Sequence, residues 1–191
     1  MQDILERDLT RDEQLKLRNN RTGLALLQLS WIMVFVCLSV VNIQLRWSQP
    51  SWPPPGVAKL SVFLPAIATA LLIVSSYFAR RGGKRLSGGD LNRFQTDWRV
   101  TLLLGLIFVA LMGVEWMKVP DSGQYSDVFR VLSGFHVVHA LAIGLYLWRV
   151  TRHAATVGYT PQNFFAVEAG VKLWYFVVIA WLLFFAVLYV F

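Results

Sequence analysis

The segment TLLLGLIFVALMGV, residues 101–114, contains no charged side chain, and its neighbours extend the apolar run to about 99–118. A helix rises about 1.5 Å per residue and the hydrocarbon layer of a bilayer is about 30 Å thick, so about 20 such residues are enough to cross it. Apolar and polar residues do not alternate here with a period of two, as they would in a strand of a membrane β-barrel. The segment therefore predicts a transmembrane α-helix.

Four further stretches meet the same requirement, at about 23–45, 57–79, 128–150 and 165–191. The chain of 191 residues is 56% hydrophobic and only 15% charged, whereas a soluble domain carries about 25% charged residues. We predict an all-α, polytopic membrane protein: a bundle of five transmembrane helices over residues 23–191. Residues 1–22 are expected to form a cytoplasmic tail. The first span is too long for a signal peptide and is expected to be retained.

Basic residues are distributed unequally between the two sides of these spans. Residues 1–22 and the connections at 80–99 and 149–164 hold thirteen Lys and Arg residues, and the opposite connections hold four. Positive residues gather on the cytoplasmic side of membrane proteins, so we expect the N-terminus in the cytoplasm and the C-terminus outside. The net charge of +7 is thus interpreted as topology, and not as a surface for nucleic acid.

Two connections carry turn-forming residues. The segment RRGGKRLSGGDLNRF, residues 80–94, is expected to be an exposed cytoplasmic loop, because it contains four glycines among basic residues. It lacks the preceding strand and the GK[ST] spacing of a phosphate-binding loop. The segment WSQPSWPPPG, residues 47–56, predicts a rigid interfacial turn that re-enters the membrane at Val57.

The ionisable residues inside the spans are candidates for function, because such groups are costly in a bilayer. His136 and His139 are three residues apart and share a helical face. A haem, copper or zinc site would need more ligands, and His153 and Cys37 are the only other His and Cys residues in the chain. We favour two neutral imidazoles that are hydrogen-bonded to neighbouring helices, with Glu115 as a partner.

Glu168 and Lys172 are four residues apart, with the acid nearer the N-terminus, which is the favourable order for an ion pair on a helix. We expect a structural pair; a proton relay is the alternative, although one pair makes no path across a bilayer. The residues themselves predict no catalytic, cofactor-binding or metal site. Taken alone, they favour a subunit of a larger assembly.

Four blocks of the sequence together resemble subunit III of the haem–copper terminal oxidases, in its short five-helix form. The blocks are WPPPGV (52–57) followed by LPAIATALLIVSS (64–76), LGLIFVALMGVEW (104–116), SGFHVVHALAIG (133–144) and VEAGVKLWYFVVIAW (167–181). They occur in the order of the family's motifs. The residues that match by position are Glu115, Trp116, His136, His139, Glu168, Trp174 and Trp181.

The resemblance implies a metal-free accessory subunit in a bacterial inner membrane, beside a catalytic subunit I that holds haem and copper and beside subunit II. It implies roles in stabilising the complex, in binding phospholipid between helices and in supporting proton uptake during oxygen reduction. The matching residues, with Lys172, are then a structural and lipid-facing polar core. Catalysis would belong to the partner.

Several positions depart from the family's pattern. Trp31 follows Ser30 where the family has a buried glutamate, and Tyr175 and Val178 replace a His and an Asp. We hypothesise that Lys172 compensates Glu168 in their place. Further departures are Met112 for Gln and Ala68 for Asn.

Other functions stay open at this point. A cytochrome c oxidase is favoured over a quinol oxidase, and the related subunit that accompanies nitric oxide reductases is the next alternative. Two hypotheses assign the chain to other classes of protein. One is a small transporter or proton channel, and the other is a b-type cytochrome that uses the two histidines. No inverted repeat or broken helix favours the transporter.

Overall fold

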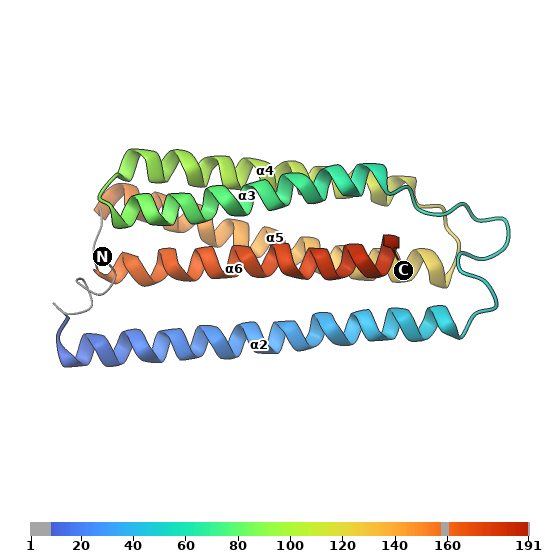
Figure 1. Cartoon of the computed structure of the whole chain (residues 1–191), viewed down its shortest axis with the longest axis horizontal. Coiled ribbons are helices and arrows are strands. Elements are labelled where there is room, and N and C mark those ends of the chain that lie inside the picture. Colours follow the sequence, from blue (N-terminus) through green and yellow to red (C-terminus); the bar gives the residue numbers. More distant parts are fainter. Residues whose placement is uncertain (1–8, 158–160, 191) are drawn as a thin grey trace.

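In the computed structural model, which describes residues 9–157 and 161–190, the chain folds into five long helices that run side by side (Figure 1). They are α2 (Arg11–Trp47), α3 (Phe63–Ser87), α4 (Leu91–Lys118), α5 (Gln124–Val157) and α6 (Pro161–Phe185), and a π-helical turn, η1 (Ala186–Val190), continues α6. All five are long and apolar enough to cross a membrane. The predicted all-helical class with five membrane helices is confirmed.

Side chains satisfy free backbone N–H groups at the starts of α2 and α4. Thr10 and Glu13 form a capping box at the start of α2, each side chain bonding the backbone of the other residue. Asp90 accepts a hydrogen bond from the backbone N–H of Arg93 at the start of α4. Between α2 and α3, residues 48–62 form no helix. Helix α3 begins at Phe63, six residues after the predicted start of the second span at Val57.

The segment expected to be a cytoplasmic loop is mostly helical. Helix α3 continues through Gly82 and Gly83 to Ser87, and α4 begins four residues later at Leu91. Only the turn around Gly89 leaves the helix, with a φ of +82° that favours glycine. The loop prediction for 80–94 is therefore wrong, because glycine in this helix serves close packing.

Helix α2 also begins earlier than its predicted span, at Arg11, so most of the expected tail forms a continuous helix with the first span. Residues 1–8 lie outside the described part of the chain, as does Phe191 at the end of the fifth span.

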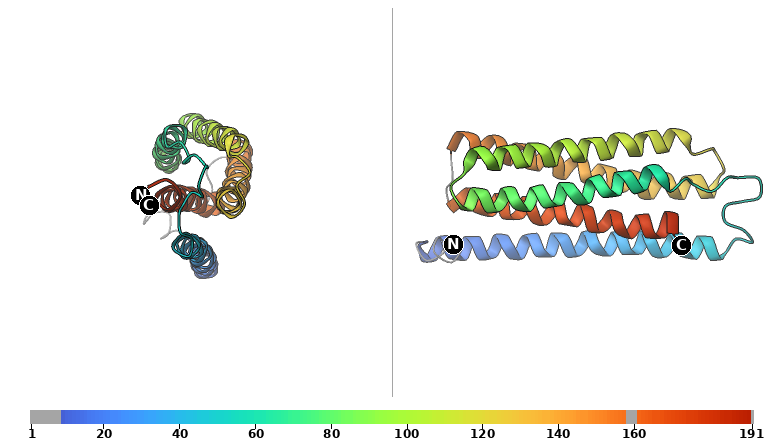
Figure 2. Two further views of the ribbon diagram at one scale, coloured as in Figure 1. Left: turned by 90° about the vertical axis from the view of Figure 1, so that its right-hand side faces the viewer. Right: turned by 45° about the horizontal axis from the view of Figure 1, so that its top comes forward.

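Helices α3 to α6 surround the core, and α2 lies along the outside of α6 (Figure 2, left). In the apolar stretch of α6, 50% of the residues are buried inside the bundle, against 17% for α2. Helix α6 is thus the most buried of these five helices, and α2 is the least buried.

Three glycines admit two buried tryptophans between the helices. A Cβ atom on Gly82 would lie 2.5 Å from Trp98 Cδ1, and one on Gly170 would lie 2.7 Å from Trp98 Cη2. A Cβ atom on Gly105 would lie 2.6 Å from Trp174 Cη2. Small residues let helix backbones approach closely in membranes, and here they make room for indole rings.

We predict that Gly105→Ala destabilises the bundle by about 1–3 kcal/mol, because the new methyl group overpacks a filled core. Gly113→Ala in the same helix is the matched control, since nothing lies within 4 Å of a Cβ atom there. Thermal unfolding of both purified variants in a mild detergent measures the difference. Equal melting temperatures for the two variants would contradict this packing account.

Candidate functional site

Three buried tryptophans, no more than 2% exposed, donate their indole N–H groups to helix α3. The bonds are Trp98 Nε1 to the Ala79 carbonyl oxygen (3.1 Å), Trp174 Nε1 to Ser75 Oγ (2.9 Å) and Trp181 Nε1 to Thr69 Oγ1 (2.8 Å). A buried indole needs such a partner. Trp174 and Trp181 were candidate residues in the sequence, and their bonds join α6 to α3. Trp98 was missed because it follows a segment that was interpreted as a loop.

Trp116 joins the C-terminal end of α4 to α5. Its Nε1 donates to Ser133 Oγ at 2.6 Å, and the ring lies over Gly134, where a Cβ atom would be 2.7 Å from Trp116 Cζ2. The side chain is otherwise 41% exposed. It therefore combines a specific contact between helices with a surface that faces outward.

The two histidines pack in an aromatic cluster. The Nδ1 atom of His139 lies 2.8 Å from the Phe135 carbonyl oxygen of its own helix, and its ring meets Trp31 edge to face at 5.0 Å. His136 is fully buried, with Phe108 and Trp181 at ring distances of 5.5 and 5.2 Å. Among the described residues, neither ring nitrogen of His136 has a hydrogen-bond partner.

Glu115 is not the partner of these histidines, which corrects the expectation from sequence. It is 3% exposed, its Oε1 lies 3.9 Å from Lys118 Nζ, and this oxygen forms no hydrogen bond with any described residue. The reason is axial distance: His136 packs at the level of Phe108, and Glu115 lies seven residues, or about 10 Å, further along α4.

Glu168 lies between two cations. Lys172 Nζ donates to its Oε1 at 2.7 Å, which confirms the predicted pair on one helix. Arg21 of α2 donates to Oε2 from Nη2 at 2.8 Å and from Nε at 3.1 Å. Arg21 was missed, because a partner 147 residues away leaves no periodic signal. This Glu168 cluster fastens α2 to α6 at the end of the bundle where α2 begins.

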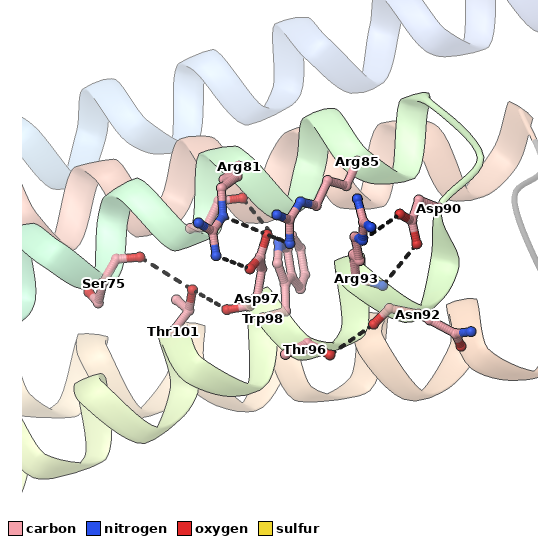
Figure 3. A network of polar contacts seen from close by, with 11 residues as sticks. Ser75, Arg81, Arg85, Asp90, Asn92, Arg93, Thr96, Asp97, Trp98 and Thr101 are labelled. Carbon is pink, nitrogen blue, oxygen red and sulfur yellow. Dashed lines mark hydrogen bonds and ion pairs between the residues drawn. The ribbon is translucent and has the colours of Figure 1, made fainter.

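A second ionic cluster joins α3 to α4 at the same end (Figure 3). The carboxylate of Asp97 is 1% exposed and lies between two guanidinium groups. Arg81 donates to it at 2.6 and 3.0 Å, and Arg85 lies at 3.0 Å. Asp97 follows a run of basic residues and comes just before an apolar span, and the sequence reasoning did not use this signal.

In the part of the chain that the structure describes, no three His, Cys, Asp or Glu residues come together in a group that could hold a metal. Cys37 is exposed on α2. In the described spans, tryptophan N–H groups and charged side chains join one helix to another, whereas several hydroxyl groups bond to a carbonyl of their own helix. The fold and this core therefore define a class: a helical membrane protein with an interhelical polar core.

Comparison with known proteins gives the family. The family model for cytochrome c oxidase subunit III matches residues 9–191. A cytochrome c oxidase subunit 3 from Synechocystis is 28% identical over 174 residues, covering 87% of this chain and 73% of that protein. Those from Cyprinus carpio and Danio rerio are 29% and 30% identical over 142 residues, 72% of this chain. The chain belongs to the cytochrome c oxidase subunit III family.

The chain covers only part of the length of these relatives. The chain spans about half (54%) of each of the two fish proteins. What the longer relatives do as whole proteins therefore comes to this chain only as a proposal.

A double-mutant cycle tests the Glu168 cluster. Combining Glu168→Gln with Arg21→Met, and separately with Lys172→Met, should give coupling energies of about 1–2 and about 0.5 kcal/mol. The Arg21 coupling is expected to be larger because Arg21 is 32% exposed and Lys172 49%. Unfolding in mixed detergent micelles measures both. Simple additivity in both cycles would show that the charges are not coupled.

Asp97→Asn should cost about 2–3 kcal/mol of stability. That is less than the 3–5 kcal/mol for breaking a fully buried pair, because Arg81 and Arg85 keep 35% and 31% of their side chains exposed. Asp121→Asn is the control, because Asp121 is 87% exposed and its ion pair with Arg130, at 3.3 Å, lies at the surface. The same unfolding measurement compares the two variants. An Asp97→Asn variant as stable as the wild type would show that the Asp97 carboxylate does not hold α3 against α4.

Proposed function

We propose that this chain is an accessory subunit of a bacterial haem–copper terminal oxidase, with cytochrome c as the favoured electron donor of the complex. The observation that carries the proposal is the family match over residues 9–191. In this proposal the chain lies in the inner membrane beside the catalytic subunit and subunit II. Oxygen reduction coupled to proton translocation belongs to the subunits that hold haem and copper.

The proposed contribution of this chain is to stabilise the catalytic subunit and its surrounding phospholipid. The bundle supports this role because its polar core holds the helices together and α2 exposes a long apolar surface. The exposed apolar side chains on the central part of α2 include Leu26, Leu29, Ile32, Met33, Val36, Val40 and Val41. Such a surface suits lipid and a neighbouring membrane subunit equally.

The proposed support of proton uptake is indirect. Trp31, at the position that resembles the family's buried glutamate, packs against His139 and Phe176 at ring distances of 5.0 and 5.4 Å. An indole ring carries no exchangeable acid in the physiological range, so we assign this position a packing role. The chain then acts by preserving the environment of the catalytic subunit.

Co-purification tests the assignment. A tagged copy of the chain, extracted in a mild detergent, should bring down a haem–copper catalytic subunit that mass spectrometry identifies, whereas an untagged strain should not. A copper-binding subunit II in the same sample indicates cytochrome c oxidase, and its replacement by a quinol-type subunit indicates quinol oxidase. Recovery of no haem–copper subunit would contradict the proposal.

A nitric oxide reductase is the second candidate partner, and the departures at Trp31, Tyr175 and Val178 from the oxidase pattern favour it. The catalytic subunit that is recovered decides between the two enzymes.

We also propose that the N-terminus lies in the cytoplasm and the C-terminus outside, as the charge distribution indicates. In a Cys37→Ser background, Ser51→Cys in the connection between α2 and α3 should react with a membrane-impermeant maleimide on intact spheroplasts. Asp12→Cys at the other end of α2 should react only after lysis. The opposite pattern would invert the topology.

A further inference from the structure

Three side chains that carry oxygen atoms come together at the end of the bundle that lies away from the Asp97 and Glu168 clusters. Glu115 belongs to the last turn of α4, Tyr125 to the first turn of α5 and Tyr189 to η1. Tyr189 interacts electrostatically with both Glu115 and Tyr125. We call these three residues the Glu115–tyrosine cluster.

The cluster is buried although it lies at the end of the helices. Glu115 is 3% and Tyr125 6% exposed, and the hydroxyl oxygen of Tyr189 is buried as well. Apolar rings pack against Tyr189, Phe129 edge to face at 6.3 Å and Phe185 at 5.4 Å. Bulk solvent therefore does not solvate these groups, and a buried polar group is costly unless it forms a hydrogen bond.

The connection between α2 and α3 covers one side of the cluster. Trp52 packs edge to face against the ring of Tyr125 at 5.1 Å. The backbone N–H of Leu60 donates to the Tyr125 hydroxyl oxygen at 3.3 Å. Because this oxygen acts as an acceptor there, the hydroxyl proton of Tyr125 is still available to an acceptor on another group.

Two oxygens of the cluster lack a direct partner. Within the described residues, Glu115 Oε1 and the Tyr189 hydroxyl oxygen form no hydrogen bond. The two side chains interact electrostatically but do not bond to each other, which is the situation in which a bridging molecule satisfies both groups. The carboxylate comes from α4 and the hydroxyl from η1, so such a molecule would join two elements.

The chemistry of the three groups selects the kind of molecule. Glu115 repels an anion. A cation such as Ca²⁺ takes about six to eight oxygen ligands, with several carboxylates or carbonyls among them, whereas this cluster has one carboxylate, and Lys118 Nζ already lies 3.9 Å from its Oε1. Water both donates and accepts hydrogen bonds, and a buried water typically forms about three.

We propose that the Glu115–tyrosine cluster binds one water molecule, which donates to Glu115 Oε1 and accepts the hydroxyl protons of Tyr125 and Tyr189. This water would connect the end of α4 to the start of α5 and to η1, under the connection that carries Trp52. The site goes beyond the proposed function and does not depend on it, because it rests on the packing of this chain alone.

Radiolytic labelling tests the site in the purified full-length chain in a mild detergent, or in the complex with which it co-purifies. A short X-ray pulse converts water to hydroxyl radicals, which oxidise the side chains beside a bound water even when these are buried. Tyr189 should be oxidised several-fold faster than Tyr146. Tyr146 is the matched control, because it is also partly buried and its hydroxyl donates directly to the Ala166 carbonyl oxygen at 3.1 Å.

Two variants at one position show whether Glu115 holds the water. Glu115→Leu removes the acceptor and should lower the oxidation of Tyr189 to the level of Tyr146. Glu115→Gln keeps an oxygen acceptor and should preserve the labelling of the wild type. Unchanged oxidation of Tyr146 in both variants shows that the bundle is still folded. If Glu115→Leu does not fold, the comparison of Tyr189 with Tyr146 in the wild type still decides.

Equal oxidation of Tyr189 and Tyr146 in the wild type would overturn the proposal. So would a Glu115→Leu variant that folds and labels as the wild type does. Melting temperatures with added NaCl or CaCl₂ separate water from a cation. A cation-dependent rise in the wild type that Glu115→Gln abolishes would identify the ligand as a metal ion and overturn the assignment to water.

Discussion

The arrangement of the bundle depends on buried indole N–H groups that must find acceptors where water is scarce. Trp98, Trp174 and Trp181 all find theirs on α3, at Ala79, Ser75 and Thr69. Lipid chains are as apolar as leucine, so burial alone gives helices in a bilayer little preference for one another. Hydrogen bonds of defined length and direction supply that preference, and these three set how α4 and α6 lie against α3.

The same constraint explains the distribution of glycine. Gly82 and Gly170 leave room for the ring of Trp98, and Gly105 leaves room for the ring of Trp174. The two ionic clusters then close one end of the bundle, the Asp97 cluster between α3 and α4 and the Glu168 cluster between α2 and α6. Helix α2 has no such tryptophan contact to α3 and lies furthest from the core.

The sequence predicted the features that have a local cause. Runs of apolar residues predicted five membrane helices, and the spacing of Glu168 and Lys172 predicted their ion pair. Features that depend on the packing of distant segments were missed. Arg21 reaches Glu168 only because α2 lies along α6, and Gly82 lies inside α3, where it leaves room for Trp98. By local rules, the glycines and basic residues of 80–94 indicate a loop.

The two histidines also show what sequence spacing can and cannot predict. Their spacing correctly placed them on one face of α5, but that face meets the rings of Phe35 and Phe108 and not a carboxylate. Which group faces a residue across a helix interface depends on the axial register of two helices. A sequence without structural context does not contain that register.

The continuity of α2 has a mechanical consequence. Its 37 residues correspond to a rod of about 55 Å, whereas the hydrocarbon layer is about 30 Å thick. A large part of a single stiff helix must therefore project beyond the bilayer. Arg21 lies in the N-terminal third of α2, and its ion pair with Glu168 holds this long helix against α6 at that end.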